Sequence, residues 1–203
     1  MAIINQATRE LQVKIVYYGP AQSGKTTNLE QVHSNVRVSD AGAKGSLTSL
    51  ATSSDRTLFF DFSPLEAVDV RGFKAKFALF TVPGQVIYNA TRQIVLRGVD
   101  GIVFVADSRP SKMEENIEAF RQLEENLKEL NLTFEDIPVV LQYNKRDMPD
   151  AAPIEDLDRA LNNRQVRFPY FEASAAKCEG VFETLNSISR LLLQKWGAPA
   201  PTI

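Results

Sequence analysis

The stretch that decides the fold is residues 19–26, which read Gly-Pro-Ala-Gln-Ser-Gly-Lys-Thr. An apolar run, residues 11–18, precedes it and predicts a buried strand, and a helical pattern begins near Lys25. Between a strand and a helix, the spacing G-x-x-x-x-G-K-T is typical of a loop whose backbone N–H groups surround a phosphate group. The competing interpretation is a plain strand-to-helix turn, which the flanking strand and helix disfavour. We therefore expect a triphosphate site here.

The side chains of this loop have separate predicted roles. Lys25 is expected to reach the β- and γ-phosphate oxygens, and the Thr26 hydroxyl is placed to ligate Mg²⁺. The full set expected to contact the nucleotide here is Gly19, Ala21, Gln22, Ser23, Gly24, Lys25, Thr26 and Thr27.

Size and composition fit one globular domain, because the chain has 203 residues, of which 44% are hydrophobic and 24% charged. We expect residues 1–197 to form that domain and residues 198–203 to be a flexible tail. The net charge of -2 argues against a nucleic-acid-binding surface. No apolar segment approaches the ~20 residues of a membrane span. The ends carry neither a myristoylation nor a prenylation signal, so we expect membranes to be reached only through partners. The one cysteine and the absence of a membrane span favour a cytoplasmic protein, which we expect to be a monomer when alone.

Apolar runs alternate with helical patterns along the chain, which is typical of an α/β sheet with helices on both faces. We expect a mostly parallel six-stranded sheet with one antiparallel edge, formed by residues 58–62 and 73–80. Residues 39–55 are predicted to be a mobile loop. Ser111 and Glu114 predict a capping box at the start of a surface helix.

Two further loops follow later strands, and the carboxyl ends of parallel strands meet at one edge of a sheet. In residues 144–147, Asn-Lys-Arg-Asp, the Asp147 carboxylate can accept from both N1–H and the N2 amine of guanine, whereas adenine offers neither donor. Asn144 is expected to tie this loop to the phosphate loop, and the Lys145 stem to lie along the base plane. By itself N-K-x-D is a weak polar-turn signal, but behind a phosphate loop it favours guanine.

The last of these loops contains Ser174, Ala175 and Ala176. Ala175 is expected to offer its backbone N–H to the guanine O6 atom, with Ser174 bracing Asp147.

These motifs, in this order, resemble those of the small Ras-like GTPases along nearly the whole chain. The chain is similar in particular to the bacterial MglA-type GTPases that set cell polarity, and the segments that carry this resemblance are residues 17–20, 56–62, 81–85 and 97–101. The resemblance implies a P-loop NTPase fold and a GTP/GDP switch with Mg²⁺. It also implies a roadblock-fold MglB homodimer as activating partner, nucleotide-dependent effectors, an exchange factor and recruitment to a cell pole.

Gln85 and Arg56 are the residues expected to act in hydrolysis. Gln85 is expected to orient the attacking water, with Gly84 beside the nucleotide. Arg56, directly before Thr57, is expected to supply the catalytic arginine from within the chain, because its fork geometry suits phosphate oxygens. The alternative role of Arg56 is a solvent-exposed loop charge.

The metal site departs from the Ras-like pattern, because Thr81 stands where that pattern has aspartate. Thr26 and Thr57 are the expected ligands. Asp61 is a candidate to replace the missing carboxylate through a water molecule, and a solvent-facing aspartate is an equal alternative.

Two rival functions stay open on the sequence alone. A scaffold that binds GTP with negligible turnover is favoured by the missing aspartate and opposed by Gln85 and Arg56. A small-molecule kinase would need a lid and an acceptor site, and the sequence has no arginine-rich lid segment.

Overall fold

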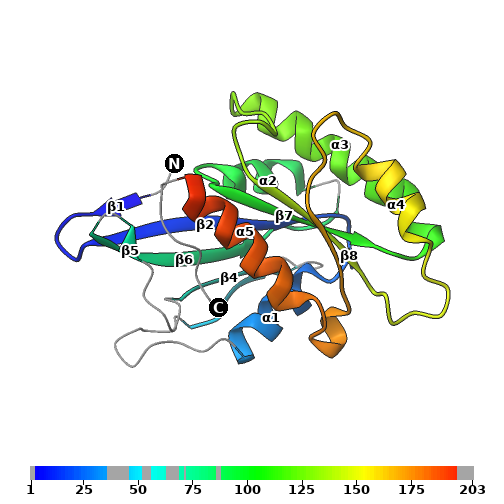
Figure 1. Cartoon of the computed structure of the whole chain (residues 1–203), viewed down its shortest axis with the longest axis horizontal. Coiled ribbons are helices and arrows are strands. Elements are labelled where there is room, and N and C mark those ends of the chain that lie inside the picture. Colours follow the sequence, from blue (N-terminus) through cyan, green and yellow to red (C-terminus); the bar gives the residue numbers. More distant parts are fainter. Residues whose placement is uncertain are drawn as a thin grey trace.

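The computed structural model describes residues 3–35, 46–51, 56–62, 69–70, 72–85 and 88–195, with the side chains of β4 left out (Figure 1). The tail predicted at residues 198–203 lies outside the described residues, as do residues 39–45 and 52–55 of the predicted loop.

One nine-stranded sheet runs through the molecule in the order β3-β4-β6-β2-β7-β8-β9, with β1 paired to β2 and β5 paired to β6. The bounds are β1 Ile3–Asn5, β2 Glu10–Tyr18, β3 Thr48–Ala51, β4 Arg56–Phe62, β5 Asp69–Val70, β6 Phe73–Thr81, β7 Gly101–Asp107, β8 Val139–Asn144 and β9 Tyr170–Glu172. The pairs from β6 through β2, β7 and β8 to β9 are parallel. The β3–β4 and β4–β6 pairs are antiparallel.

The parallel sheet with an antiparallel edge is confirmed, but the predicted number of six strands is too low. The largest difference is β3, which lies inside the segment predicted to be a loop and pairs with β4 from Thr48 opposite Phe59 to Ala51 opposite Arg56. The sequence of β3, Thr-Ser-Leu-Ala, has no strong alternation. Strand formation depends heavily on packing against the neighbouring strand, so a strand of this kind cannot be predicted from its own residues.

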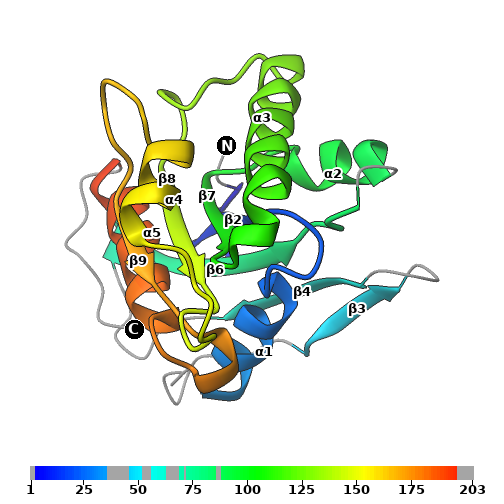
Figure 2. The same cartoon turned by 90° about the vertical axis from the view of Figure 1, so that its right-hand side faces the viewer.

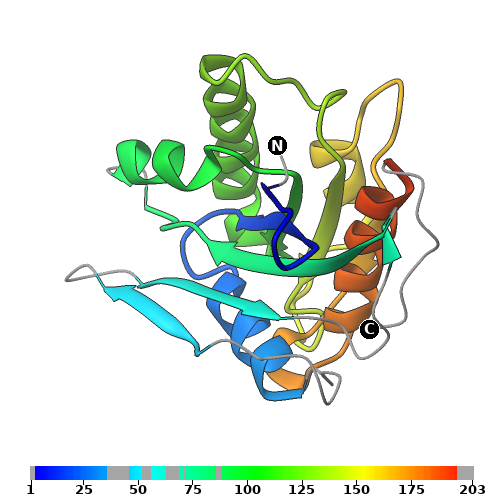
Figure 3. The same ribbon diagram turned by 90° about the vertical axis from the view of Figure 1, so that its left-hand side faces the viewer.

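The helices cover both faces of the sheet (Figures 2 and 3). Their bounds are α1 Lys25–Asn35, α2 Asn89–Leu96, α3 Met113–Glu129, α4 Ile154–Leu161 and α5 Val181–Lys195. Buried residues of α1 and α5 share one apolar cluster with the sheet, for example Leu29 and Leu185. Those of α2, α3 and α4 share the other, for example Leu96, Phe120 and Leu157.

The predicted capping box at Ser111 is wrong. Pro110–Lys112 form a 3₁₀ turn, α3 begins at Met113, and its N-cap residue Lys112 makes no side-chain cap bond. Pro110 is suited to the first position of such a turn, because its ring fixes φ near the helical value and its missing N–H is not needed there. Because α3 begins at Met113, Ser111 is not its N-cap residue and cannot form the capping box.

The strands end so that the loops after β2, β7, β8 and β9 gather at one edge of the sheet. The strands that carry them are packed on both faces: every residue of β7 and of β8 is buried. A rigid support of this kind holds the loops at its ends in fixed positions relative to one another. Among the described residues, no helix is long and apolar enough to cross a membrane.

Candidate nucleotide-binding site

The phosphate loop, residues 19–26, is held against the ends of β7 and β8. A Cβ atom on Gly19 would lie 2.2 Å from the Val105 carbonyl oxygen, and one on Gly24 would lie 2.1 Å from Asn144 Nδ2. Both glycines have positive φ, +146° and +100°, and Gln22 also has φ of 58°. Side chains are thus excluded at both glycines by space and by backbone conformation.

Lys25 does not extend away from this loop. Its Nζ donates to the carbonyl oxygens of Gly19 at 3.0 Å and Pro20 at 2.5 Å, and the residue is 5% exposed. Thr26 and Thr27 follow it, half-buried, in the first turn of α1. An ammonium group has three N–H donors, and these two bonds aim two of them at the loop's own carbonyl oxygens.

Asn144 joins the phosphate loop to both later loops. Its Nδ2 donates to the Ser23 carbonyl at 2.7 Å, and its Oδ1 accepts from the Ala175 backbone N–H at 2.8 Å. The predicted tie between Asn144 and the phosphate loop is confirmed by the first bond. The second differs from expectation, because the Ala175 N–H predicted for guanine O6 already has a partner.

Asp147 lies exposed at the end of this loop, with Ser174 buried beside it. The nearby Ser174 hydroxyl is the main cause that holds the pKa of the Asp147 carboxyl below its usual value, although the Ser174 oxygen makes no hydrogen bond of standard geometry. Asp147 is therefore a carboxylate at neutral pH, as an acceptor for two N–H groups requires.

A cavity of about 280 Å³ lies where the three loops meet. Its lining residues are Gln22, Gly24, Thr27, Arg109, Asn144, Lys145, Asp147, Met148, Ala175 and Ala176. Eight of these ten were predicted from the sequence to contact the nucleotide. Sequence reasoning missed Arg109 and Met148, and the available signal for Arg109 was a cation two residues beyond the end of the central strand β7.

Gly84 brings the segment after β6 onto the phosphate loop. A Cβ atom at Gly84 would lie 2.4 Å from both the backbone N and the Cα atom of Ala21. Gln85, the next residue, is half-buried. Gln85, the residue expected to orient water, therefore directly follows a residue packed against the backbone of the phosphate loop.

The remaining predicted residues lie on β4, for which the structure describes the strand pairing. Arg56 is opposite Ala51 and Thr57 opposite Leu50, both on the edge strand β3. Asp61 is opposite Ala78, three residues before the end of β6 at Thr81, which is about 10 Å along a strand at ~3.3 Å per residue. In this register, the backbone of Asp61 is well removed from the edge where the phosphate loop lies.

Oxygen ligands are what Mg²⁺ requires, and Thr26 supplies a hydroxyl next to Lys25 at the start of α1. Thr81 replaces the carboxylate of the usual pattern and is fully buried. Among the described side chains predicted as metal ligands, Thr26 thus supplies an oxygen that fits Mg²⁺, and β6 supplies no carboxylate at Thr81.

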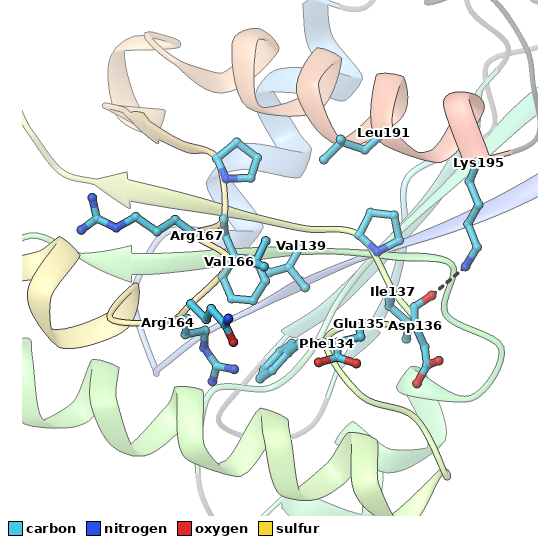
Figure 4. Close-up of a pocket in the computed structure, with 14 residues that line it drawn as sticks. Phe134, Glu135, Asp136, Ile137, Val139, Arg164, Val166, Arg167, Leu191 and Lys195 are labelled. Carbon is cyan, nitrogen blue, oxygen red and sulfur yellow. Dashed lines mark hydrogen bonds between the residues drawn. The ribbon is translucent and has the colours of Figure 1, made fainter.

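A larger cavity, of about 900 Å³, lies away from these motifs, beside the segments that lead into β8 and β9 and the end of α5 (Figure 4). Its cationic groups serve the fold: Lys195 Nζ donates to the Asp136 carbonyl at 2.6 Å, and the Arg164 guanidinium lies 4.5 Å from the centre of the Phe134 ring. None of the residues predicted to bind nucleotide lines it. Convergent polar groups, more than cavity size, therefore distinguish the nucleotide cavity.

The fold and these three loops define a P-loop protein with a cavity where the loops meet, and comparison with known proteins gives the class. The Ras family profile matches residues 47–194, so the chain belongs to the Ras family and is a GTP hydrolase.

Two relatives were compared with the chain along their lengths. The chain is 49% identical over 193 residues to the mutual gliding-motility protein MglA of Myxococcus xanthus, covering 95% of this chain and 96% of that protein. It is 28% identical over 144 residues to the Ras-related protein Rab-13 of Rattus norvegicus, covering 70% of this chain and 66% of Rab-13. The chain is therefore an MglA-type member of the family.

Proposed function

We propose that this GTPase is a molecular switch that binds GTP and GDP with Mg²⁺ and hydrolyses GTP slowly unless an activating partner stimulates it. The observation that carries the proposal is Asn144, whose two hydrogen bonds join the phosphate loop at Ser23 to the base loop at Ala175. A phosphate site and a base site joined in this way suit one ligand that has both groups.

Asp147 selects the base in this proposal. Its ionised carboxylate accepts from N1–H and the N2 amine of guanine, while the Lys145 stem lies along the ring. With adenine, the unprotonated N1 would face the carboxylate, and an unpaired buried acceptor costs ~1–3 kcal/mol. The side chains of both residues line the cavity between the loops.

Lys25, Thr26 and Gln85 act on the triphosphate. Lys25 exchanges the Gly19 and Pro20 carbonyls for β- and γ-phosphate oxygens, and Gln85 orients the attacking water. Thr26 and Thr57 would hold Mg²⁺, which would supply charge neutralisation on those oxygens. Arg56, carried beside Thr57, stabilises the charge of the transition state from within the chain.

The partner proposed for stimulation is an MglB-like roadblock-fold homodimer. It acts by positioning Thr57 and Gln85 for catalysis, so the free monomer hydrolyses GTP slowly. The Myxococcus xanthus relative is named as a mutual gliding-motility protein, which supports an output in gliding motility. We extend this to cell polarity, with nucleotide-dependent effectors, an exchange factor and recruitment of a cytoplasmic protein to a pole.

A second candidate, a GTP-stabilised scaffold with negligible turnover, is favoured by one observation. Thr81 is buried at the position where a carboxylate would hold the metal-bound water. A scaffold of this kind would bind GTP and Mg²⁺ but would not respond to an activator.

Phosphate release from GTP and from ATP, measured on the purified protein with and without a roadblock-fold activator, separates these functions. The switch predicts slow release from GTP, strong stimulation by the activator, and no release from ATP. Gln85→Ala is the matched variant, expected to bind GTP and lose stimulation. Equal binding of ATP and GTP would overturn the proposed base selectivity, and tight GTP binding without any stimulated release would favour the scaffold.

A further inference from the structure

Asp107, the last residue of β7, is a buried carboxylate that holds two cations at the edge of the nucleotide cavity. Its Oδ2 accepts from Lys145 Nζ at 2.7 Å and from the Arg109 guanidinium at 2.7 Å, while its Oδ1 accepts from Arg109 Nε at 3.1 Å. The Asp107 side chain is 1% exposed, whereas those of Arg109 and Lys145 are 27% and 24% exposed. The carboxylate is thus covered by the two cations, which themselves line the cavity.

The backbone around this carboxylate is fixed from two sides. Asn116 on α3 accepts from the Asp107 N–H at 2.9 Å and donates to its carbonyl at 2.8 Å. The Ser108 N–H donates to the Asn144 carbonyl at 3.0 Å, which joins the ends of β7 and β8. Asp107 therefore has a set position relative to the loop that carries Lys145.

Lys145 is constrained at both ends of its side chain. Its backbone has φ of 67°, a left-handed conformation that non-glycine residues seldom adopt, and its ammonium group is held by Asp107. A long lysine side chain loses up to ~2 kcal/mol of rotamer freedom when it is ordered. Asp107 brings about that ordering before a ligand arrives.

We propose that Asp107 positions Lys145 and Arg109 as one wall of the base pocket, with the Lys145 stem and the plane of the Arg109 guanidinium covering one face of the purine ring. This inference rests on the proposed guanine-nucleotide function. A planar, weakly hydrated guanidinium stacks well on an aromatic face, and a cation over such a face is stabilised by the ring electrons. Asp107 acts through the two cations, and Arg109 contacts the base directly.

The charges of this wall fit its two roles. Two cations face one carboxylate, so the wall keeps an excess of positive charge, whereas Asp147, which also lines the cavity, is negative. Burial by itself raises the pKa of the Asp107 carboxyl, but the hydrogen bonds from Arg109 and Lys145 outweigh it and hold that pKa below its usual value. The pairing is therefore intact at neutral pH.

Dissociation of a fluorescent GDP from Asp107→Asn and Arg109→Ala tests the inference. Asp107→Asn keeps the shape of the side chain and removes the charge that orders Lys145, and Arg109→Ala removes the stacking plane. Each is expected to release GDP and GTP roughly tenfold faster, by the same factor for both nucleotides, because the contacts are to the base. The matched control is Asp158→Asn. Asp158 is a buried carboxylate on α4 that pairs with Arg167 and does not line this cavity, so its substitution is expected to leave nucleotide release unchanged.

A double-mutant cycle with Lys145→Ala separates positioning from general stability. If Asp107 acts through Lys145, Asp107→Asn has a much smaller effect in the Lys145→Ala background than in the unaltered protein. Additive effects, or release rates of Arg109→Ala equal to those of the unaltered protein, would overturn the inference. If the Asp107→Asn variant does not fold, the GDP release rate of the Arg109→Ala variant tests the inference, because the Arg109 side chain is partly exposed. Failure of the unaltered protein to prefer GDP over ADP would instead refute the proposed function.

Discussion

The two halves of the candidate site differ in what their polar groups contact. On the base side, Asn144 and Asp107 hold the surrounding loops by hydrogen bonds, and a cavity remains between them. On the phosphate side, Lys25 contacts carbonyls of its own loop, and Gly84 lies against the backbone of Ala21. The base half thus contains a cavity with its loops tied together, whereas in the phosphate half the lysine is bonded to its own loop.

The supports beneath the two halves explain the difference. The base loops follow β7 and β8, which are central strands with all residues buried. The residues expected at the metal and the γ-phosphate lie on β4, next to the edge strand β3, and on the segment after β6. Central strands hold their positions more tightly than edge strands, so we infer that nucleotide identity is read by a fixed half and phosphate number by a movable half.

The largest expected effect is on the movable half. Arg56→Ala should keep GTP and Mg²⁺ binding but lose partner-stimulated turnover by a factor on the order of 10³, because an arginine that stabilises the transition state contributes about that much. Single-turnover phosphate release with saturating activator is the measurement. Full stimulation of this variant by an activator whose own arginines had been replaced would show that Arg56 is not the catalytic arginine.

Gly84→Ala should affect only the movable half. The added Cβ atom would lie 2.4 Å from Ala21 backbone atoms, so the segment carrying Gln85 must move away from the phosphate loop. A misplacement of about 1 Å can cost ~10²-fold in rate, and we expect a loss of that order in stimulated turnover. GDP affinity should stay within a few-fold, as measured by nucleotide dissociation; a comparable loss of GDP affinity would contradict the division into halves.

Asp147→Asn should affect only the fixed half. The amide can donate to the O2 atom of xanthine, so preference should shift from GTP toward XTP by about 10- to 100-fold, which corresponds to ~1–3 kcal/mol. Competition between the two nucleotides for the variant measures it. Continued preference for GTP over XTP would remove Asp147 from the base site.

The smallest expected effect is on acid stability. The folded-state pKa of Asp107 lies below its unfolded value of ~3.9, so its contribution to stability is present above that value and is lost as pH falls through the folded-state pKa. Thermal unfolding should therefore show that Asp107→Asn weakens the dependence of the melting temperature on pH below about 4. Between pH 5 and 8, the difference between the two proteins should not change with pH.

The fixed half could largely be predicted from the sequence. Its motifs, residues 19–26 and 144–147, are contiguous, and the chemistry of each follows from neighbouring residues in known spacing. The pairing of Asp107 with Lys145 could not be predicted this way, because the two residues are 38 positions apart and meet only through the β7–β8 register. The partner of the Ala175 amide was missed for the same reason.

The movable half was predicted less completely. The strand β3 was taken for part of a loop, because its pairing with β4 and not its own pattern makes it a strand. The position of Asp61 also depends on register: a shift of β4 by two residues, which keeps every side chain on its own face, would bring Asp61 from Ala78 to Phe80, next to Thr81. On the face that carries Leu58, Phe60 and Phe62, such a shift replaces one large apolar group with another, whereas on the other face Asp61 takes the place of Phe59 opposite Phe80.

Structures of the protein with GDP and with a non-hydrolysable GTP analogue test the division into a fixed and a movable half most directly. We predict that the bonds from Asn144 to Ser23 and from Asp107 to Lys145 are the same in both. In the GTP-analogue form, Lys25 should have left the carbonyls of Gly19 and Pro20, and β4 should pair with β6 in a shifted register that brings Asp61 toward Thr81. An unchanged β4 register together with rearranged base loops would contradict the account.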